Sequence, residues 1–342
     1  AGLHSEEGLN VVGATYAGSP FVLMGHNGTI AFSFTVAGVD LVDYFIDKPQ
    51  TRRREVIRIR GEKGPRVVEV QQGARGVMIS RDISLRWAGF DTPPAEIVDS
   101  AVRLQKARNF DEFRRVVTRF GALDANWIYS DRMGNIGTQL GAPLPIRDFD
   151  TYLRQPASEP RTEWKGYRPL EETPSAFNPA QGFLASCNNE IVSAAWPYSI
   201  PGFFDPYRID RATSLLRTRR TPAEMKAMQL DLISGLATRW KGLAAEGARA
   251  AALNAEANAL ERWDGTMSAD SREAALFEFW WRSMARAVFE DDLGKEWEPG
   301  RFLLDEALTI PAKAVDDKRT PQVESTRDIA ALPTAPGPLA GP

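Results

Sequence analysis

Two acidic side chains, Asp40 and Asp43, lie three positions apart, directly after an apolar segment that reads as a strand. Carboxylates are the ligands that a hard cation such as Ca²⁺ prefers, and two of them within four residues could supply part of its shell of about six to eight oxygen atoms. Taken by itself, however, the Asp-Leu-Val-Asp stretch is more typical of the solvated end of a strand.

The other residues with reactive side chains are few. The single cysteine, Cys187, has no companion for an internal disulfide or a zinc pattern, so it reads as a small buried side chain. The two histidines, His4 and His26, are too few and too isolated for a histidine-rich metal site. A Ser-His-Asp triad is therefore weakly supported.

The composition argues against two classes of partner. The 342 residues carry 42 Lys and Arg against 45 Asp and Glu, and the formal charge of −3 gives no electrostatic reason to bind nucleic acid or an anionic membrane surface. No stretch approaches the ~20 consecutive apolar residues of a membrane-spanning helix. We expect a globular protein with no nucleic-acid or membrane partner.

The first half of the chain predicts a β-rich region. Residues 9–90 read as short strands separated by Gly, Pro and charged turns. Helical spacing of apolar residues replaces this pattern at about 93–120, in two segments. Two strands then follow as a hairpin, Ala125–Asp131 and Asn135–Gly141. The stretch from Pro143 to Pro206 shows little periodicity, but its aromatic content argues against disorder.

From Arg208 onward the pattern is mainly helical. A helix is expected to begin at Thr221, where a Thr-Pro start precedes a capping-box Glu, and to run through the MQLDLIS stretch. Two more amphipathic helices are expected around Leu243–Trp263 and Ala274–Phe289. Residues 331–342 are mostly Pro, Gly and Ala with little to bury, so they read as a disordered tail.

This order of elements favours an α+β protein, in particular a layered αββα domain, because nothing alternates as β-α-β. We assign residues 1–207 to the β-rich part of the core, with inserted helices at about 93–120, and residues 208–330 to a mainly helical region of the same chain. The sequence also begins without an initiating Met, a basic segment or an apolar signal core. We therefore expect a processed chain or a fragment.

Several stretches together resemble the penicillin acylase (penicillin amidase) family of N-terminal-nucleophile hydrolases. The stretches are GHNGTIAFSFT, DLVDYF, NWIYSDRMGNIG, FNPAQGFLASCNNE, PYRIDR, MQLDLIS and ERWDG. They occur in the same order as in the family and with similar spacing. Each stretch alone is weak evidence for the family, but the ordered set is specific to it. The resemblance implies an αββα N-terminal-nucleophile fold, incomplete here, and a match to an internal part of the family's β-chain.

The resemblance also implies an activity. The family hydrolyses amides, here the side-chain amide of a β-lactam, an N-acyl-homoserine lactone or a related small N-acyl substrate. Self-cleavage of a precursor exposes an N-terminal Ser, whose own α-amine, with a reference pKa of ~8, serves as the base. That Ser would precede Gly2 and is absent from this sequence, and Ser5 has no family match. The implied partner is the α-chain of the same precursor, and the implied location is periplasmic or secreted.

Three residues match the family's catalytic positions. Val36 corresponds to the backbone N–H donor of the oxyanion hole, and Asn188 corresponds to its side-chain donor. Arg208 corresponds to an arginine near that Asn, which orients the site and assists maturation. Each also has an ordinary interpretation: Val36 as a packed strand residue, Asn188 as a turn residue beside Asn189, and Arg208 as a helix arginine in a surface ion pair.

The resemblance also gives the two aspartates a role. Asp40, the Val42 carbonyl and Asp43 match ligand positions of the family's calcium site, and a further carbonyl would come from near Tyr152. A later family Asp aligns near Ile200, which has no ligating side chain, and Asp205 is a possible substitute. The family's α-chain Glu is missing, so we expect a structural Ca²⁺ that is held weakly or lost.

A second interpretation stays open at this point. Without its nucleophile, the chain could belong to a catalytically silent homologue that serves a binding or structural function. A precursor junction encoded upstream would favour the enzyme, whereas a start codon at this position would favour the silent homologue.

Overall fold

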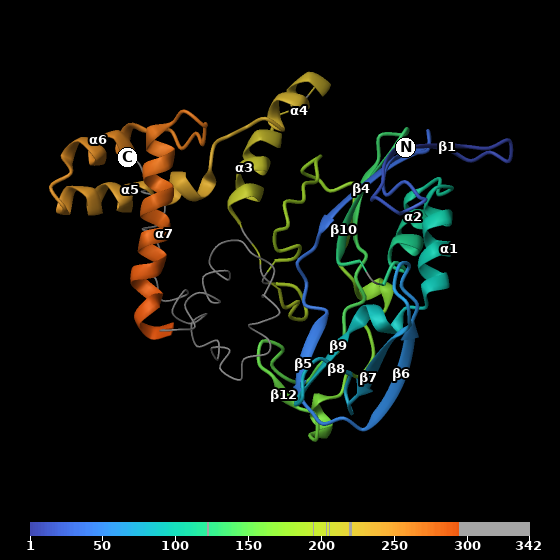
Figure 1. Cartoon of the computed structure of the whole chain (residues 1–342). Helices are drawn as coiled ribbons and strands as arrows, with labels where there is room; N and C mark the ends of the chain where they lie inside the picture. The colour runs from blue at the N-terminus through green and yellow to red at the C-terminus, as the bar shows by residue number, and fades with distance from the viewer. Residues whose placement is uncertain (122, 194, 203, 205, 219–220, 294–342) are drawn as a thin grey trace.

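The computed structural model describes residues 1–293, apart from residues 122, 194, 203, 205 and 219–220 (Figure 1). Two β-sheets and a set of helices make up this part of the chain, so the expected α+β class is confirmed. None of the helices in these residues is both long and apolar enough to cross a membrane. The predicted tail, residues 331–342, and the end of the predicted helical region lie outside the described residues.

The larger sheet has seven strands, and its middle pair is its longest. These two strands align antiparallel over seven residue pairs, from Ile30 opposite Asp131 to Val36 opposite Ala125. In order across the sheet, the strands are β1 (Gly2–His4), β2 (Asn10–Ala14), β3 (Met24–His26), β4 (Ile30–Val36), β10 (Ala125–Asp131), β11 (Ile136–Leu140) and β13 (Ser175–Phe177). The β10–β11 hairpin was predicted within one residue at each end.

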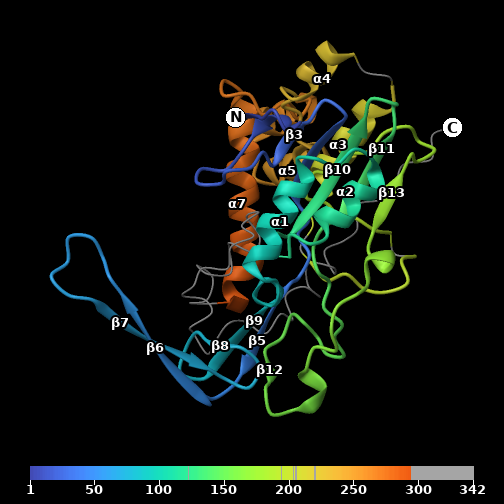
Figure 2. The same cartoon turned by 90° about the vertical axis from the view of Figure 1, so that its right-hand side faces the viewer.

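Two helices, α1 (Pro94–Leu104) and α2 (Phe110–Val117), cover one face of this sheet (Figure 2). The Asn109 side chain caps α2 by accepting a hydrogen bond from the Glu112 amide at 2.9 Å, which satisfies a donor that the first helical turn leaves open. Beneath the helices, aromatic rings fill the core: Phe113 lies 5.2 Å from Tyr129 between centroids. This packing fixes β10 and, through it, β4.

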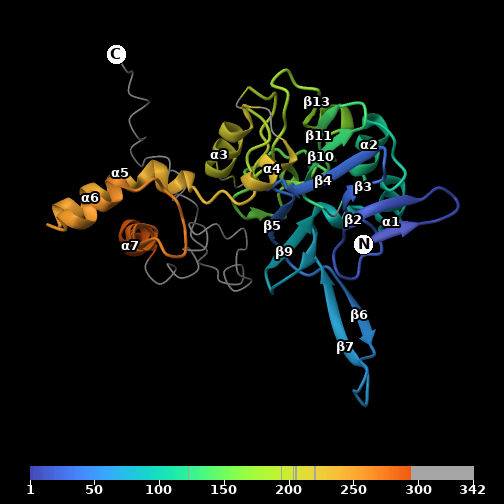
Figure 3. The same cartoon turned by 90° about the horizontal axis from the view of Figure 1, so that it is seen from above.

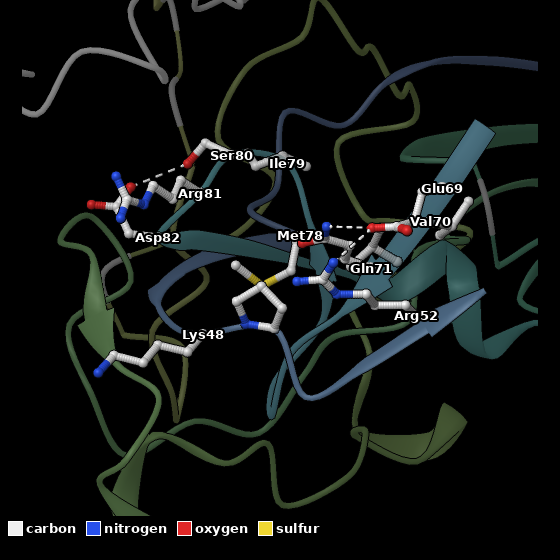
Figure 4. Close-up of a pocket in the computed structure, with 12 residues that line it drawn as sticks. Lys48, Arg52, Glu69, Val70, Gln71, Met78, Ile79, Ser80, Arg81 and Asp82 are labelled. Carbon is white, nitrogen blue, oxygen red and sulfur yellow. Dashed lines mark hydrogen bonds and ion pairs between the residues drawn. The ribbon is translucent and has the colours of Figure 1, made fainter. Parts of the chain in front are cut away.

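The smaller sheet has six strands and continues from the larger one, because β5 directly follows the link after β4. Its order is β12 (Gln155–Pro156), β5 (Val42–Ile46), β9 (Ile83–Trp87), β8 (Val77–Met78), β7 (Arg66–Gln72) and β6 (Thr51–Ile57). The β6–β7 hairpin projects away from the rest of the molecule (Figures 2 and 3). A pocket lined by residues of β6, β7, β8 and their flanking turns contains none of the predicted site residues (Figure 4).

Five helices follow residue 206 in the described chain, and the last three of them lie farthest from the sheets (Figure 1). The five helices are α3 (Tyr207–Leu216), α4 (Pro222–Met228), α5 (Gly235–Ala250), α6 (Asn254–Arg262) and α7 (Arg272–Leu293). The capping box predicted at Thr221 is present. The expected continuation of α4 through MQLDLIS is wrong, because the helix ends at Met228. The prediction of a single helix at Leu243–Trp263 is also wrong. The helix is interrupted at Ala252, whose φ of 63° is not helical, and α6 begins after it.

Short one-turn segments complete the described elements. Three 3-10 helices lie at Ala88–Asp91, Pro160–Thr162 and Leu170–Glu172. Two of them, together with β12 and β13, fall within the stretch from Pro143 to Pro206 that the sequence left without periodicity.

Removing the Phe113 ring tests the contribution of this core to stability. Phe113 is fully buried, whereas Phe279, also in a helix, is 75% exposed. We expect Phe113→Ala to lower the free energy of unfolding by about 3–5 kcal/mol, and Phe279→Ala to change it by less than about 0.5 kcal/mol. Urea unfolding of both variants measures the difference, and equal effects would contradict the assigned core.

Candidate active site

The C-terminal end of β4 presents a backbone N–H away from its neighbour β10. The amide of Ala37 donates to Asp124 O at 3.0 Å, and successive residues of a strand point their backbone groups to opposite edges. The N–H and C=O of Val36 therefore point away from β10. On that edge β3 pairs with β4 only at Ala31 and Phe32, so among the described residues Val36 has a strand partner in β10 but none in β3.

Asn188 lies at this same edge of β4. Its Nδ2 donates to Val36 O at 2.7 Å, across 152 positions of sequence, and Arg208 Nη2 donates to its Oδ1 at 3.2 Å. Arginine only donates and a carbonyl only accepts, so these two partners fix which end of the amide faces Val36. The structure thus brings together all three residues that the sequence singled out as catalytic.

The loop that carries Asn188 is tied to the sheet by Ser186. The Ser186 hydroxyl lies 2.6 Å from the Thr35 hydroxyl and accepts from Asn126 Nδ2 at 3.0 Å. Asn126 is 7% exposed and comes from β10, so the loop is anchored on both middle strands. Sequence reasoning missed these anchors, because Ser, Thr and Asn at such separations carry no recognisable spacing.

The backbone of Asn188 is in the left-handed region, with φ at 58°. Asn tolerates this conformation better than most residues, and the conformation is common where a side chain must be aimed from a turn. The next residue, Asn189, makes the turn itself: its Oδ1 accepts from Cys187 N at 3.0 Å and its Nδ2 donates to Glu190 O at 2.7 Å. The two asparagines therefore have different surroundings, and only Asn188 contacts Val36 in the described chain.

This arrangement can stabilise negative charge on a carbonyl oxygen. One N–H of the Asn188 amide donates to Val36 O, which leaves its second N–H on the same edge as the Val36 N–H. Neutral N–H donors at one edge suit an oxyanion, and a single such donor contributes about 3–4 kcal/mol to stabilising the transition state. Arg208 adds a positive charge at the oxygen end of the Asn188 amide.

A partly buried carboxylate, which the sequence did not indicate, lies beside this end of β4. Asp124 Oδ2 accepts from the amide of Gly38 at 3.0 Å, in the link between the two sheets. The pKa of Asp124 is raised to about 6, mainly by burial; hydrogen bonds from the Gly38 and Val39 amides oppose this rise, and the charge of Asp40 makes a smaller contribution to it. The carboxyl group holds the link in place.

The expected calcium ligands are close together but already engaged. Asp43 Oδ2 accepts from Arg147 Nε at 2.7 Å and from Trp164 Nε1 at 2.6 Å. Asp40 Oδ1 accepts from the Val42 amide at 3.1 Å, and the Asp40 carbonyl accepts from Arg147 Nη1 at 3.0 Å. Burial is the largest influence on both carboxyl groups and raises the pKa of Asp43 to about 6, with the charge of Arg147 opposing it.

The other expected positions add no carboxylate to this set among the described residues. Near Tyr152 a backbone carbonyl was expected as the ligand; the Tyr152 hydroxyl hydrogen-bonds with both the carbonyl and the amide of Gly202, at 3.2 and 3.1 Å. Ile200 is buried in the apolar cluster between the sheets, and Asp205 lies outside the described residues. Within those residues no group of three or more His, Cys, Asp or Glu could hold a metal ion. Because a guanidinium lies against both carboxylate-bearing residues, this set does not fit Ca²⁺.

Comparisons with known proteins address the whole chain. The family model described as "Penicillin amidase" matches residues 1–335. The acyl-homoserine lactone acylase QuiP of Pseudomonas fluorescens (strain Pf0-1) is 26% identical over 96% of this chain and 47% of its own length. The penicillin acylase 2 proenzyme of Pseudomonas sp. (strain SE83) is 26% identical over 92% of this chain and 43% of its own length. The chain thus spans somewhat less than half the length of these relatives.

Among solved structures, a thermostable penicillin G acylase from Alcaligenes faecalis is similar, with a TM-score of 0.74 and 23% sequence identity. The likeness covers 87% of this chain and 60% of that one. It confirms the expected N-terminal-nucleophile hydrolase fold.

The pH dependence of stability tests the buried state of Asp124. Between the ordinary carboxyl pKa of 3.8 and its folded pKa of about 6, the folded protein binds a proton that the unfolded chain has lost. This group therefore makes the protein less stable as the pH rises through that window. Asp124→Asn removes the titration, so its stability relative to wild type should increase from pH 4 to above pH 6. Urea unfolding across this range measures it, and parallel profiles would contradict the assignment.

Proposed function

We propose that this chain, which belongs to the penicillin amidase family, is the part of an acylase that holds the oxyanion during hydrolysis of a linear amide. The observation that carries the proposal is the meeting of Val36, Asn188 and Arg208. These three residues match the family's catalytic positions, and direct hydrogen bonds connect them at one edge of β4.

The substrate we propose is a small N-acyl compound, either a β-lactam with an amide side chain or an N-acyl-homoserine lactone. The names of two relatives, an acyl-homoserine lactone acylase and a penicillin acylase, support both classes. We further propose that a Ser at the N-terminus of the mature β-chain, outside these 342 residues, attacks the amide. The α-chain of the same precursor is the proposed protein partner, and the proposed location is periplasmic or secreted.

In this mechanism the residues of this chain stabilise the charge that develops on the substrate, and they form no covalent bond with it. As the Ser oxygen adds to the amide carbon, the carbonyl oxygen becomes negative, and the Val36 N–H and the Asn188 amide donate to it. The proton of the Ser passes to its own α-amine and then to the leaving amine. Arg208 keeps Asn188 Oδ1 occupied, so the amide presents its N–H group rather than its oxygen.

Substitution of Asn188 in the complete protein tests the proposal. We expect Asn188→Ala to reduce kcat for a chromogenic acyl amide by roughly 10²- to 10³-fold, with a smaller change in KM, because the donor acts mainly as charge develops. Asn188→Gly should lose as much, although Gly adopts a φ of 58° without strain. Asn189→Ala is the control and should retain most of the activity.

Three outcomes would count against the proposal. If Asn189→Ala alone abolishes turnover, the family match is displaced by one residue. If all three variants keep the wild-type kcat, Asn188 is only a turn residue. If the complete, matured protein turns over no acyl amide, the chain belongs to a silent homologue instead.

A further inference from the structure

The two aspartates that follow β4 share one buried cation, and that cation is part of the chain. The side chain of Arg147 is 5% exposed and that of Asp43 is 2% exposed. Nε of Arg147 lies 2.7 Å from Asp43 Oδ2, and its Nη2 lies 3.9 Å from Asp40 Oδ1. The single positive charge of this guanidinium therefore lies against both acidic residues, with its close contact to Asp43.

Backbone pairing places this guanidinium. The segment around Arg147 pairs with the segment after Trp164: the Ile146 amide donates to Gly166 O, and the Lys165 amide donates to Ile146 O, both at 2.9 Å. These bonds bring Arg147 and Trp164 to Asp43 from two separate loops. The ring of Trp164 also lies 5.1 Å from the Arg147 guanidinium carbon, within the range of a cation–π contact.

The neighbouring arginine does not supply this charge. Arg86 lies opposite Asp43 across the β5–β9 pair, and its guanidinium also lies over the Trp164 ring. Its ion pair is with Asp91, at 2.8 Å. Among the ion pairs of the described residues, those of Asp40 and Asp43 are both with Arg147.

A divalent ion would have to displace these contacts. Ca²⁺ binds oxygen atoms at about 2.3–2.6 Å, and Asp43 Oδ2 already accepts two hydrogen bonds, from Arg147 and Trp164. An ion beside Asp43 would also lie within a few ångströms of a buried positive charge, where repulsion is poorly screened. Asp43 therefore already has a positively charged partner from within the chain.

We propose that Arg147 takes the place of a divalent cation at the Asp40–Asp43 pair, so that the link between the two sheets is held by an internal guanidinium and needs no calcium. The proposal concerns stability and is independent of the proposed catalytic function. This role also explains the two aspartates directly after β4, because they lie against the guanidinium of Arg147, which another loop carries.

The first test uses the complete wild-type protein with two probes. Its melting temperature should be the same in excess EDTA and in millimolar CaCl₂. Tb³⁺, which resembles Ca²⁺ and emits when a nearby tryptophan is excited, should show no emission sensitised through Trp164. A melting temperature that falls in EDTA, or sensitised Tb³⁺ emission, would overturn the proposal if Asp43→Asn abolishes that response.

The second test removes the guanidinium. Arg147→Met leaves two buried carboxylates without a cation, so we expect its melting temperature to fall by about 5 °C or more in EDTA. Millimolar CaCl₂ should restore part of this loss, and Tb³⁺ emission through Trp164 should appear. The control is Arg161→Met, because Arg161 pairs with Glu159 on the surface and is 59% exposed. This variant should melt like wild type under both conditions.

Two results for Arg147→Met would overturn the proposal. The first is a melting temperature equal to that of wild type in EDTA, because the carboxylates would then need no cation. The second is a destabilised variant that neither CaCl₂ nor Tb³⁺ affects, because Arg147 would then be an ordinary ion-pair partner. If Arg147→Met does not fold, the EDTA and Tb³⁺ measurements on the wild-type protein and on Asp43→Asn still test the proposal.

Discussion

The pairing of β4 with β10 sets the direction of every group at the candidate active site. The hydrogen bond from the Ala37 amide to Asp124 O fixes the alternation along β4, so the backbone groups of Val36 point to the other edge. A shift of one residue would turn the Val36 N–H into the sheet and away from Asn188. The aromatic core packs against β10, and β10 sets the register of β4. The core therefore helps to direct the Val36 N–H toward the edge where Asn188 lies.

The same strand end creates a charge problem, because the chain runs directly from Val36 into a link with buried acids. The negative charge of Asp40 raises the pKa of both Asp43 and Asp124. Burying one carboxylate without a partner costs several kcal/mol, so a cation must be supplied. A guanidinium suits this role because its planar donors can bond a carboxylate and a carbonyl together, as Arg147 does with Asp43 and Asp40.

Much of this could be predicted from sequence, and the failures have physical causes. Local patterns predicted the strand before Asp40, the β10–β11 hairpin and both sheet-covering helices, and motif order predicted that Val36, Asn188 and Arg208 belong to one site. Strands such as β12 and β13, two and three residues long, carry too few residues for a period to show. Arg147 was missed because a charged residue in an irregular stretch is normally solvated, and only the fold shows that a second loop buries it.

The open edge at Val36 depends on where β3 leaves the sheet. Gly25 pairs with Phe32 and His26 with Ala31, so a continued register would place Phe21 opposite Val36. The chain departs before that point.

The departure has a packing cause. Val22 is fully buried and Leu23 is 7% exposed in the core, and the Val22 carbonyl accepts from Gln105 Nε2 at 2.8 Å. Burying these two apolar side chains removes the strand that would otherwise cover the Val36 N–H. Packing of the hydrophobic core therefore leaves the Val36 N–H without a strand partner on the β3 side. An oxyanion hole on a β-strand requires such an available N–H.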